Sequence, residues 1–295
     1  MGSPQAPSFD FSQVPTRLTN IASRDFNPPD IKGKSKAVVA PDQRFWRRAK
    51  WSPEGTHLLA QTDDHALDLF QVLDGDDERT KNPSVSKGSP HLNHVFRVTA
   101  PTTLLDWTWY PFARLGDPAT FCFIFSARDV PVRLIDANSG ATRATYGIEN
   151  HIEQFVAPNA LAFSCDGTSL YCGHATSISL FALADVGTNT CSTIALVPTK
   201  ASNGQQVQKG IVSCIAVAPV YDKDGTLIGE IVAVGTFNGT VGVYQRTGMQ
   251  RPGRWIDAAK QPTAGSGLCV AGWIEAQGTG VMQVCIVTIS RLRAS

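Results

Sequence analysis

A repeated strand–turn–strand unit is the feature that most constrains how this chain can fold. Trp51-Ser52-Pro53-Glu54-Gly55 is echoed by Phe163-Ser164-Cys165-Asp166-Gly167, and each begins with an aromatic residue that ends an apolar run before a tight turn. A third copy carries Val217-Ala218-Pro219 and reaches its Asp224-Gly225 later in the chain. A long-period repeat of short strands indicates a propeller or a solenoid.

The residues after each turn extend the repeat by two further strands. The third strands alternate in polarity and end in a bulky residue, as in Leu67–Phe70, Ile178–Phe181 and Val241–Tyr244. A fourth copy, with a different first turn, comprises Leu104–Tyr110, Phe121–Ser126 and Pro131–Asp136. Strict alternation over a few residues is typical of half-buried strands, and Asn238-Gly239 favours a tight hairpin turn.

The spacing of the copies points to a propeller with long loops. The copies start near residues 47, 103, 159 and 212, about 55 residues apart, whereas a minimal blade has roughly 40–45. The excess falls in the polar connections Asp74–Pro90, Asp185–Gln208 and Arg246–Gly265. Almost no segment has a helical period. We therefore predict an all-β chain that folds as a WD-type β-propeller of about four four-stranded antiparallel blades.

The two ends of the chain depart from the repeat. Residues 1–42 are rich in Pro, Ser and Asp without periodicity, so we predict a disordered or loosely docked N-terminal segment. The partial propeller then spans 43–284, and Gly280–Val284 is the first strand of a fifth blade. The repeat stops there, and 285–295 form an atypical end. We expect a truncated product or an imperfect gene model with an incomplete ring, whose uncovered edges favour aggregation or a need for chaperone-assisted folding.

Composition excludes several classes of protein. The 26 Lys and Arg nearly balance the 25 Asp and Glu, so nucleic-acid binding would need a local patch. The longest apolar runs are far too short to span a bilayer, and the N-terminus does not resemble a signal peptide, so we expect no membrane association. The seven cysteines are odd in number and form no Cys-x-x-Cys pair, which predicts reduced core residues in an intracellular protein.

Signatures of enzymes and metal sites are missing from the sequence. Gly265-Ser266-Gly267 is no nucleophile elbow, and Gly278-Thr279-Gly280 is not followed by a helix. We therefore predict no catalysis, cofactor, metal or small-molecule substrate. A group of acidic residues lacks the spacing of a calcium loop and predicts a solvated face. Its members are Asp63, Asp64, Asp68, Asp74, Asp76, Asp77 and Glu78.

Polar residues around the copy that starts near residue 103 are candidates for a binding site. Arg128 and Asp129 end a second strand, and Asn150, His151 and Glu153 follow the same blade. Arginine offers bidentate contacts and stacking, while Asn and His side chains can read the base edges of an extruded RNA loop. In the alternative interpretation, Arg128 and Asp129 pair to brace the strand connection, and His151 accepts a structural hydrogen bond.

Basic and aromatic residues elsewhere also admit two interpretations. The basic run includes Arg47 and Arg48, and it is either a solvated charge run or a phosphate-contacting patch or nuclear import signal. Trp107, Trp109 and Tyr110 could stack on bases. Alternation places the two Trp residues on one strand face, which favours packing between adjacent blades.

Several segments resemble the telomerase Cajal body protein family. They are Phe45-Trp46, Trp51–Gly55, Ser126–Ala137, Gly140, Arg143-Ala144, Asn150–Glu153, Leu170–Gly173, Gly210–Ala216 and Gly239–Tyr244. The resemblance covers about residues 43–284, and a weaker similarity covers Phe9–Pro29. The Ser-Arg-Asp-x-Pro segment at 126–131 is the most specific part of it.

The resemblance implies a WD-repeat scaffold without catalysis. It implies binding of small nuclear or Cajal-body RNA, such as telomerase RNA, together with RNP proteins, and support of RNP assembly or localisation. The expected location is the nucleus, in the Cajal body or nucleoplasm, with the cytoplasm as a further location. Fungal relatives linked to pre-mRNA splicing keep an alternative open, in which the chain is a protein–protein interaction platform in splicing without direct RNA binding.

Overall fold

The structure is a computed structural model that describes residues 45–73, 91–197, 208–221 and 226–246. It also describes the strand segments 255–257, 270–271, 274–277, 280–284 and 287–288. All the regular secondary structure within these ranges is β-strand, so the all-β prediction is confirmed. No helix long and apolar enough to cross a membrane occurs in this part of the chain. The predicted N-terminal segment, residues 1–42, lies outside the described residues.

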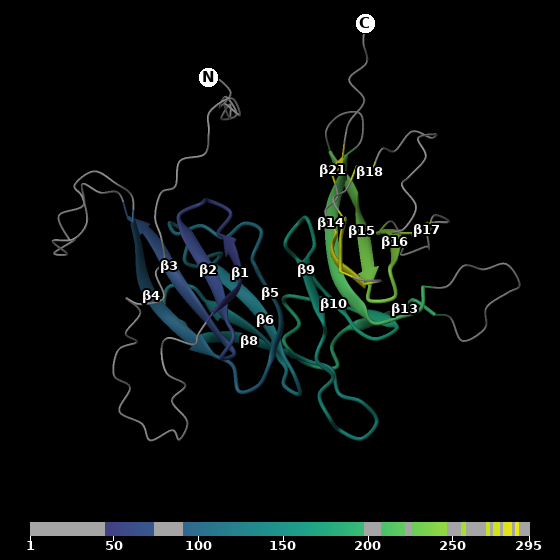
Figure 1. Ribbon diagram of the computed structural model, residues 1–295, viewed down its shortest axis with the longest axis horizontal. Coiled ribbons are helices and arrows are strands. Elements are labelled where there is room, and N and C mark those ends of the chain that lie inside the picture. Colours follow the sequence, from purple (N-terminus) through teal and green to yellow (C-terminus); the bar gives the residue numbers. More distant parts are fainter. Residues whose placement is uncertain are drawn as a thin grey trace, which may run out of the picture.

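Four antiparallel sheets follow one another along the chain, and we call them blades 1 to 4 (Figure 1). Blade 1 contains β1 (Trp46–Trp51), β2 (His57–Thr62), β3 (Ala66–Leu73) and β4 (His91–Thr99). Blade 2 contains β5 (Leu104–Trp109), β6 (Cys122–Ala127), β7 (Val132–Asp136) and β8 (Thr142–Gly147). Blade 3 contains β9 (Ala160–Phe163), β10 (Ser169–Gly173), β11 (Ser177–Ala182) and β13 (Ser192–Ala195). Blade 4 contains β14 (Val212–Tyr221), β15 (Leu227–Thr236), β16 (Thr240–Gln245) and β17 (Trp255–Asp257). These are WD-type blades, as the repeat predicted.

The outermost strands account for part of the predicted polar connections. β13 lies inside the segment Asp185–Gln208, which the sequence pattern had indicated only as a loop. The short strand β12 (Gly187–Thr188) lies in the same segment and pairs in parallel with β8, so the chain of blade 3 adds a fifth strand to blade 2.

The hydrophobic core lies between successive blades. Leu59, Leu67 and Leu69 of blade 1 pack in one cluster with Trp107 and Phe123 of blade 2. Similar clusters join blade 2 to blade 3 and blade 3 to blade 4. Trp107 is completely buried. The packing role expected for the Trp side chains of this strand is therefore confirmed, and Trp107 is not available to stack on a base.

A C-terminal hairpin begins a fifth blade. Gly280–Val284 is a strand, β20, as predicted, but it pairs with β19 (Ile274–Gln277), which precedes it, so β20 is the second strand of this hairpin and not the first. Beyond them, β18 (Val270–Ala271) pairs with β21 (Val287–Thr288). β20 lies against β14 and β15 of blade 4. The described blades form an open arc with blades 1 and 4 at its two ends (Figure 1), so the ring is incomplete, as expected.

The cysteines only partly follow the core prediction. The five described cysteines are free, and Cys122 and Cys172 are buried. Cys165, Cys191 and Cys214 are only partly buried. Cys191 still packs against the core cluster between blades 2 and 3, whereas Cys165 lies in the β9–β10 turn and Cys214 lies in β14. Cys269 and Cys285 lie outside the described residues.

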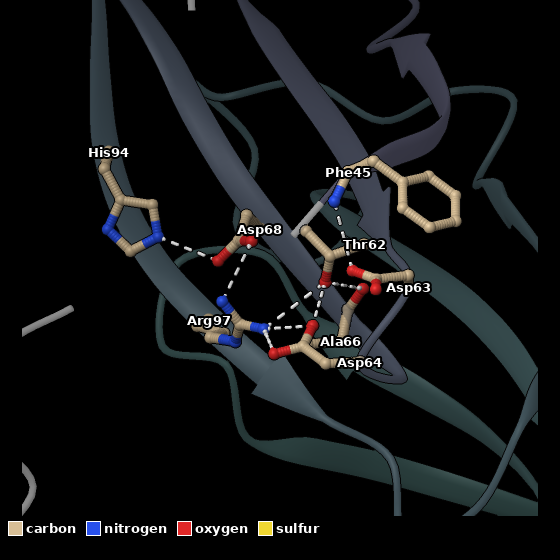
Figure 2. A network of polar contacts seen from close by, with 8 residues as sticks. All are labelled: Phe45, Thr62, Asp63, Asp64, Ala66, Asp68, His94 and Arg97. Atoms are coloured by element: carbon tan, nitrogen blue, oxygen red, sulfur yellow. Dashed lines mark hydrogen bonds and ion pairs between the residues drawn. The ribbon is translucent and has the colours of Figure 1, made fainter. Parts of the chain in front are cut away.

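A buried polar network in blade 1 corrects the prediction of a solvated acidic face (Figure 2). The Asp68 side chain is completely buried, and its Oδ1 lies 3.1 Å from His94 Nε2. Arg97 Nη1 lies 3.5 Å from Asp68 Oδ2, and its Nη2 contacts both carboxylate oxygens of Asp64 at 2.5 Å. Alternation along β3 puts Asp68 on the face opposite to Leu67 and Leu69, where His94 and Arg97 of β4 contact its carboxylate. Asp74, Asp76, Asp77 and Glu78 lie outside the described residues.

Candidate nucleic-acid interface

At one end of every blade lies the turn between its second and third strands. The linker that leads into its first strand lies at the same end. We call this end the linker face, and it comprises turns 63–65, 128–131, 174–176 and 237–239 with linkers 100–103, 148–159 and 208–211. The strand registers place these segments together: Leu104 opens β5 opposite Ala127 at the end of β6, and Val132 opens β7 opposite Tyr146 near the end of β8.

Backbone hydrogen bonds tie each linker to the turn beside it. The bonds are Asp63 N–H to the Phe45 carbonyl (3.2 Å), Arg128 N–H to Thr103 (3.0 Å), Asn159 N–H to Gly173 (2.8 Å) and Phe237 N–H to Ile211 (3.0 Å). In blades 1, 2 and 4 the turn donates, whereas in blade 3 the linker donates to the last residue of β10, so the backbone of the linker face is held in place in each blade.

Arg128 and Asp129 occupy the turn between β6 and β7 on the linker face. Both side chains are exposed. The backbone of Arg128 is anchored on both sides, since its N–H donates to Thr103 and its carbonyl accepts the Thr102 hydroxyl at 2.6 Å. Asp129 has a positive φ of 58°, which the tight turn requires. No ion pair joins the two side chains, so the bracing pair of the alternative interpretation is not formed.

Asn150, His151 and Glu153 lie in a turn of the linker between blades 2 and 3. Asn150 Oδ1 accepts the backbone N–H groups of Ile152 and Gln154, each at 3.0 Å. The carbonyl oxygen of this side chain therefore shapes the turn. His151 and Glu153 are exposed at the tip of that turn, and within the described part of the chain neither side chain has a hydrogen-bond partner. The structural hydrogen bond considered for His151 is thus not formed.

Arg47 and Arg48 are neighbours in β1 with different surroundings. A bulge in the β1–β2 pairing leaves Arg47 exposed, with its guanidinium 5.6 Å from the ring centre of Phe45. Arg48 instead forms an ion pair with Asp106 of blade 2 and lies 5.1 Å from the Trp107 ring centre. Arg47 thus remains a candidate contact, whereas Arg48 joins two blades.

Asp106 connects three blades, a role that the sequence pattern did not reveal. One carboxylate oxygen pairs with Arg48 of β1, and the other accepts the Leu161 N–H of β9 at 2.7 Å. Lys50 of β1 donates to the Trp107 carbonyl at 2.7 Å. Burial lowers the pKa of Lys50 to about 8, against the opposing effect of the nearby Asp106 carboxylate. These side chains hold the innermost strands together.

The linker face therefore offers a small set of free polar groups on a fixed backbone. Exposed Arg128 and His151 provide donors, exposed Asp129 and Glu153 provide acceptors, and Arg47 lies near its margin. Arginine can hold a phosphate or stack on a base, and carboxylates can accept from the amino groups of bases. Within the ranges that the structure describes, no group of three or more His, Cys, Asp or Glu is placed to hold a metal ion.

Comparison with known proteins places this chain near two kinds of relative. It is 27% identical to telomerase Cajal body protein 1 of Mesocricetus auratus over 237 residues, which cover 80% of this chain and 38% of the relative. The human protein of the same name is 26% identical over 237 residues, again 80% of this chain and 38% of the relative. The resemblance inferred from the sequence is confirmed.

A fungal protein is similar over a slightly shorter stretch. The guanine nucleotide-binding protein negative regulator 1 of Schizosaccharomyces pombe is 28% identical over 208 residues, which cover 70% of this chain and 49% of that protein. No family model matches the chain. The chain spans less than half the length of the curated relatives it matches.

Proposed function

We propose that this chain is a non-catalytic WD-repeat scaffold that binds small nuclear or Cajal-body RNA through its linker face. The observation that carries the proposal is the exposure of Arg128 and His151 on that face, each free of side-chain partners in the described part of the chain, on turns whose backbone is hydrogen-bonded. Similarity to proteins named for telomerase and the Cajal body supports an RNP ligand and a nuclear location.

The chemistry of this face suits an unpaired RNA loop better than a duplex. A duplex is bound mainly through its phosphates, and the net charge of this chain is only +1. Asp129 and Glu153 would repel phosphates but can accept hydrogen bonds from exposed base amino groups. Single-stranded loops present unstacked bases to such side chains. The scaffold thus recognises a loop and supports assembly or localisation of the particle that contains it.

Crosslinking followed by sequencing of bound RNA tests this proposal in cells. We expect the wild-type chain to recover small nuclear or Cajal-body RNAs and the double variant R128A/H151A to lose most of them. The matched control is R114A, because Arg114 is also exposed but lies in the β5–β6 connection at the opposite end of blade 2. Equal recovery from wild type and R128A/H151A would contradict the proposal.

A protein-interaction platform is the second candidate function, with pre-mRNA splicing as one setting for it. The similarity to a protein named as a regulator of a guanine nucleotide-binding protein favours a protein partner. Ile152 and Phe237 add exposed apolar side chains to the linker face. Nuclease treatment separates the two candidates: an RNP scaffold loses its co-purifying proteins when RNA is digested, whereas a direct protein platform keeps them.

A further inference from the structure

The β5–β6 connection crosses the end of the blades opposite the linker face. We call this end the far face, and it comprises the turns between the first and second strands of blades 1 to 3: 52–56, 110–121 and 164–168. In the connection, Ala113 is completely buried in the cluster between blades 1 and 2. Beside this anchor, Phe112 is 44% exposed and Leu115 is 41% exposed. The connection therefore presents two large apolar side chains to solvent.

The connection also reaches the turns of both neighbouring blades. The Leu115 N–H donates to Glu54 Oε2 in the β1–β2 turn at 3.0 Å. The Phe112 ring lies 5.9 Å from the Tyr110 ring, centre to centre, and packs against Gly167 of the β9–β10 turn, where an added Cβ would lie 3.0 Å from it. The connection thus spans three blades, with Leu115 beside blade 1 and Phe112 beside blade 3.

Hydrogen bonds hold the backbone of this connection along its length. They are Ala113 N–H to the Tyr110 carbonyl (3.0 Å), Asp117 N–H to Arg114 (3.1 Å), Phe121 N–H to Asp117 (3.1 Å) and Arg143 Nη1–H to Ala119 (2.7 Å). A loop that is ordered before binding loses little conformational entropy when a partner covers it. Exposed large apolar side chains on a loop of this kind are typical of an interaction site.

Carboxylates lie beside both apolar side chains. The exposed Glu54 is next to Leu115, and the exposed Asp166 adjoins the turn glycine that contacts Phe112. Together with the exposed Asp117, they outnumber the single Lys or Arg in these three turns. The far face is therefore negative, which disfavours phosphate groups and favours the cationic side chains of a protein partner.

We propose that the far face binds a basic, apolar segment of a partner protein. Two apolar side chains of that segment pack on Phe112 and Leu115, and Lys or Arg side chains on either side of them pair with Glu54 and Asp166. The far face and the linker face lie at opposite ends of the blades. The binding of this segment therefore does not depend on RNA binding, and the chain can hold both ligands at once.

Selection of a phage library of random twelve-residue peptides on the full, folded chain tests this binding. We expect the enriched clones to carry Lys or Arg on both sides of apolar residues. F112S/L115S should lower their binding in a phage immunoassay about tenfold or more, because two apolar contacts are lost together. The matched control is I152S, which removes an exposed apolar side chain from the linker face and should keep the binding.

The carboxylates are tested by variants that keep their shape. E54Q retains an oxygen acceptor for the Leu115 N–H and removes only the charge. Combined with D166N, it should weaken the binding of the clones roughly threefold, as expected for exposed ion pairs. High salt should reduce the difference between E54Q/D166N and wild type, because it screens exposed charges.

Several outcomes would overturn the proposal. These are clones that bind F112S/L115S as well as wild type, enriched clones without Lys or Arg, and a failure to enrich any clone. Clones that lose binding in I152S instead would assign the peptide site to the linker face. Crosslinks of RNA within 110–121 would assign the far face to nucleic acid. Urea unfolding confirms that each variant is folded, and E54Q/D166N tests the site without any change to its apolar residues.

Discussion

His174 is a buried histidine whose two ring nitrogens lack hydrogen-bond partners in the described part of the chain. It lies in the β10–β11 turn on the linker face and is 6% exposed. Burial lowers the pKa of His174 to about 4. The folded protein therefore holds this imidazole neutral, and its backbone still contributes to the fold, since the His174 carbonyl accepts the Val212 N–H at 2.9 Å.

The first prediction concerns how stability depends on pH. Between pH 6.5 and 4 the unfolded chain binds a proton at His174 that the folded chain excludes, so the free energy of unfolding falls as the pH drops through this window. The loss should approach about 3 kcal/mol by pH 4. Urea unfolding at pH 7, 5.5 and 4.5 measures it. H174L should flatten the dependence of the unfolding free energy on pH. H151L, at an exposed histidine, should leave that dependence unchanged. Parallel pH curves for wild type and H174L would contradict this role.

The second prediction concerns Asp106, which contacts β1 and β9 from β5. In D106A the Arg48 guanidinium and the Leu161 N–H lose their acceptor. Hydrogen bonds to charged groups contribute roughly 1.5–3 kcal/mol, so we expect the free energy of unfolding to fall by about 2–3 kcal/mol in urea titrations. R48A should cost less because Arg48 is partly solvated. A larger loss of unfolding free energy in R48A than in D106A would show that the hydrogen bond from Leu161 of blade 3 to Asp106 contributes little.

At the scale of elements, two equivalent turns allow a matched test of local strain. Gly55 closes the β1–β2 turn and Gly167 closes the β9–β10 turn, with φ of 71° and 68°. A Cβ at Gly55 would meet nothing within 4 Å, whereas one at Gly167 would lie 2.5 Å from Tyr110 Oη and 3.0 Å from the Phe112 ring. The positive φ disfavours alanine at both positions. Only at Gly167 would the added Cβ also clash with neighbouring side chains.

The third prediction follows from that difference. G55A should lower the free energy of unfolding by about 1 kcal/mol, because an L-residue is strained at positive φ. G167A should lower it by about 1 kcal/mol more, because Tyr110 must move away from its contact with Phe163. Chemical denaturation of the two variants beside wild type measures both values. Equal losses would show that the space beside Gly167 is not restricted.

The strands also show which parts of the fold the sequence pattern could predict. Inner strands such as β2 and β3 of blade 1 and β6 and β10 of blades 2 and 3 are largely buried, so their alternation or apolar runs were visible and placed them within a few residues. The outermost strands were not located, because strands such as β13 are largely exposed and resemble polar loops. Among the site residues, Arg128 and His151 were identified by type. The ion pair of Arg48 with Asp106 could not be predicted, because the two residues are 58 positions apart in the sequence.

At the scale of the whole molecule, polar contacts join the blades in addition to the apolar core. Glu230 of blade 4 accepts the Cys165 N–H at 2.8 Å and contacts the Tyr171 hydroxyl, both from blade 3. Arg246 pairs with Glu230 at 2.8 Å and donates to the Ser169 hydroxyl at 2.9 Å. With Asp106 joining blades 1, 2 and 3, the described blades form a continuous scaffold, on which the linker face can keep a fixed arrangement of side chains.

The central claim is that RNA binds this scaffold on the linker face. Ultraviolet crosslinking of the chain to co-purified RNA, followed by mass spectrometry of the crosslinked peptides, tests it most directly. We predict crosslinks within residues 128–131 and 148–159, which disappear in R128A/H151A and persist in R114A. Crosslinks confined to the opposite end of the blades, or an absence of crosslinked RNA from a folded wild-type chain, would contradict the claim.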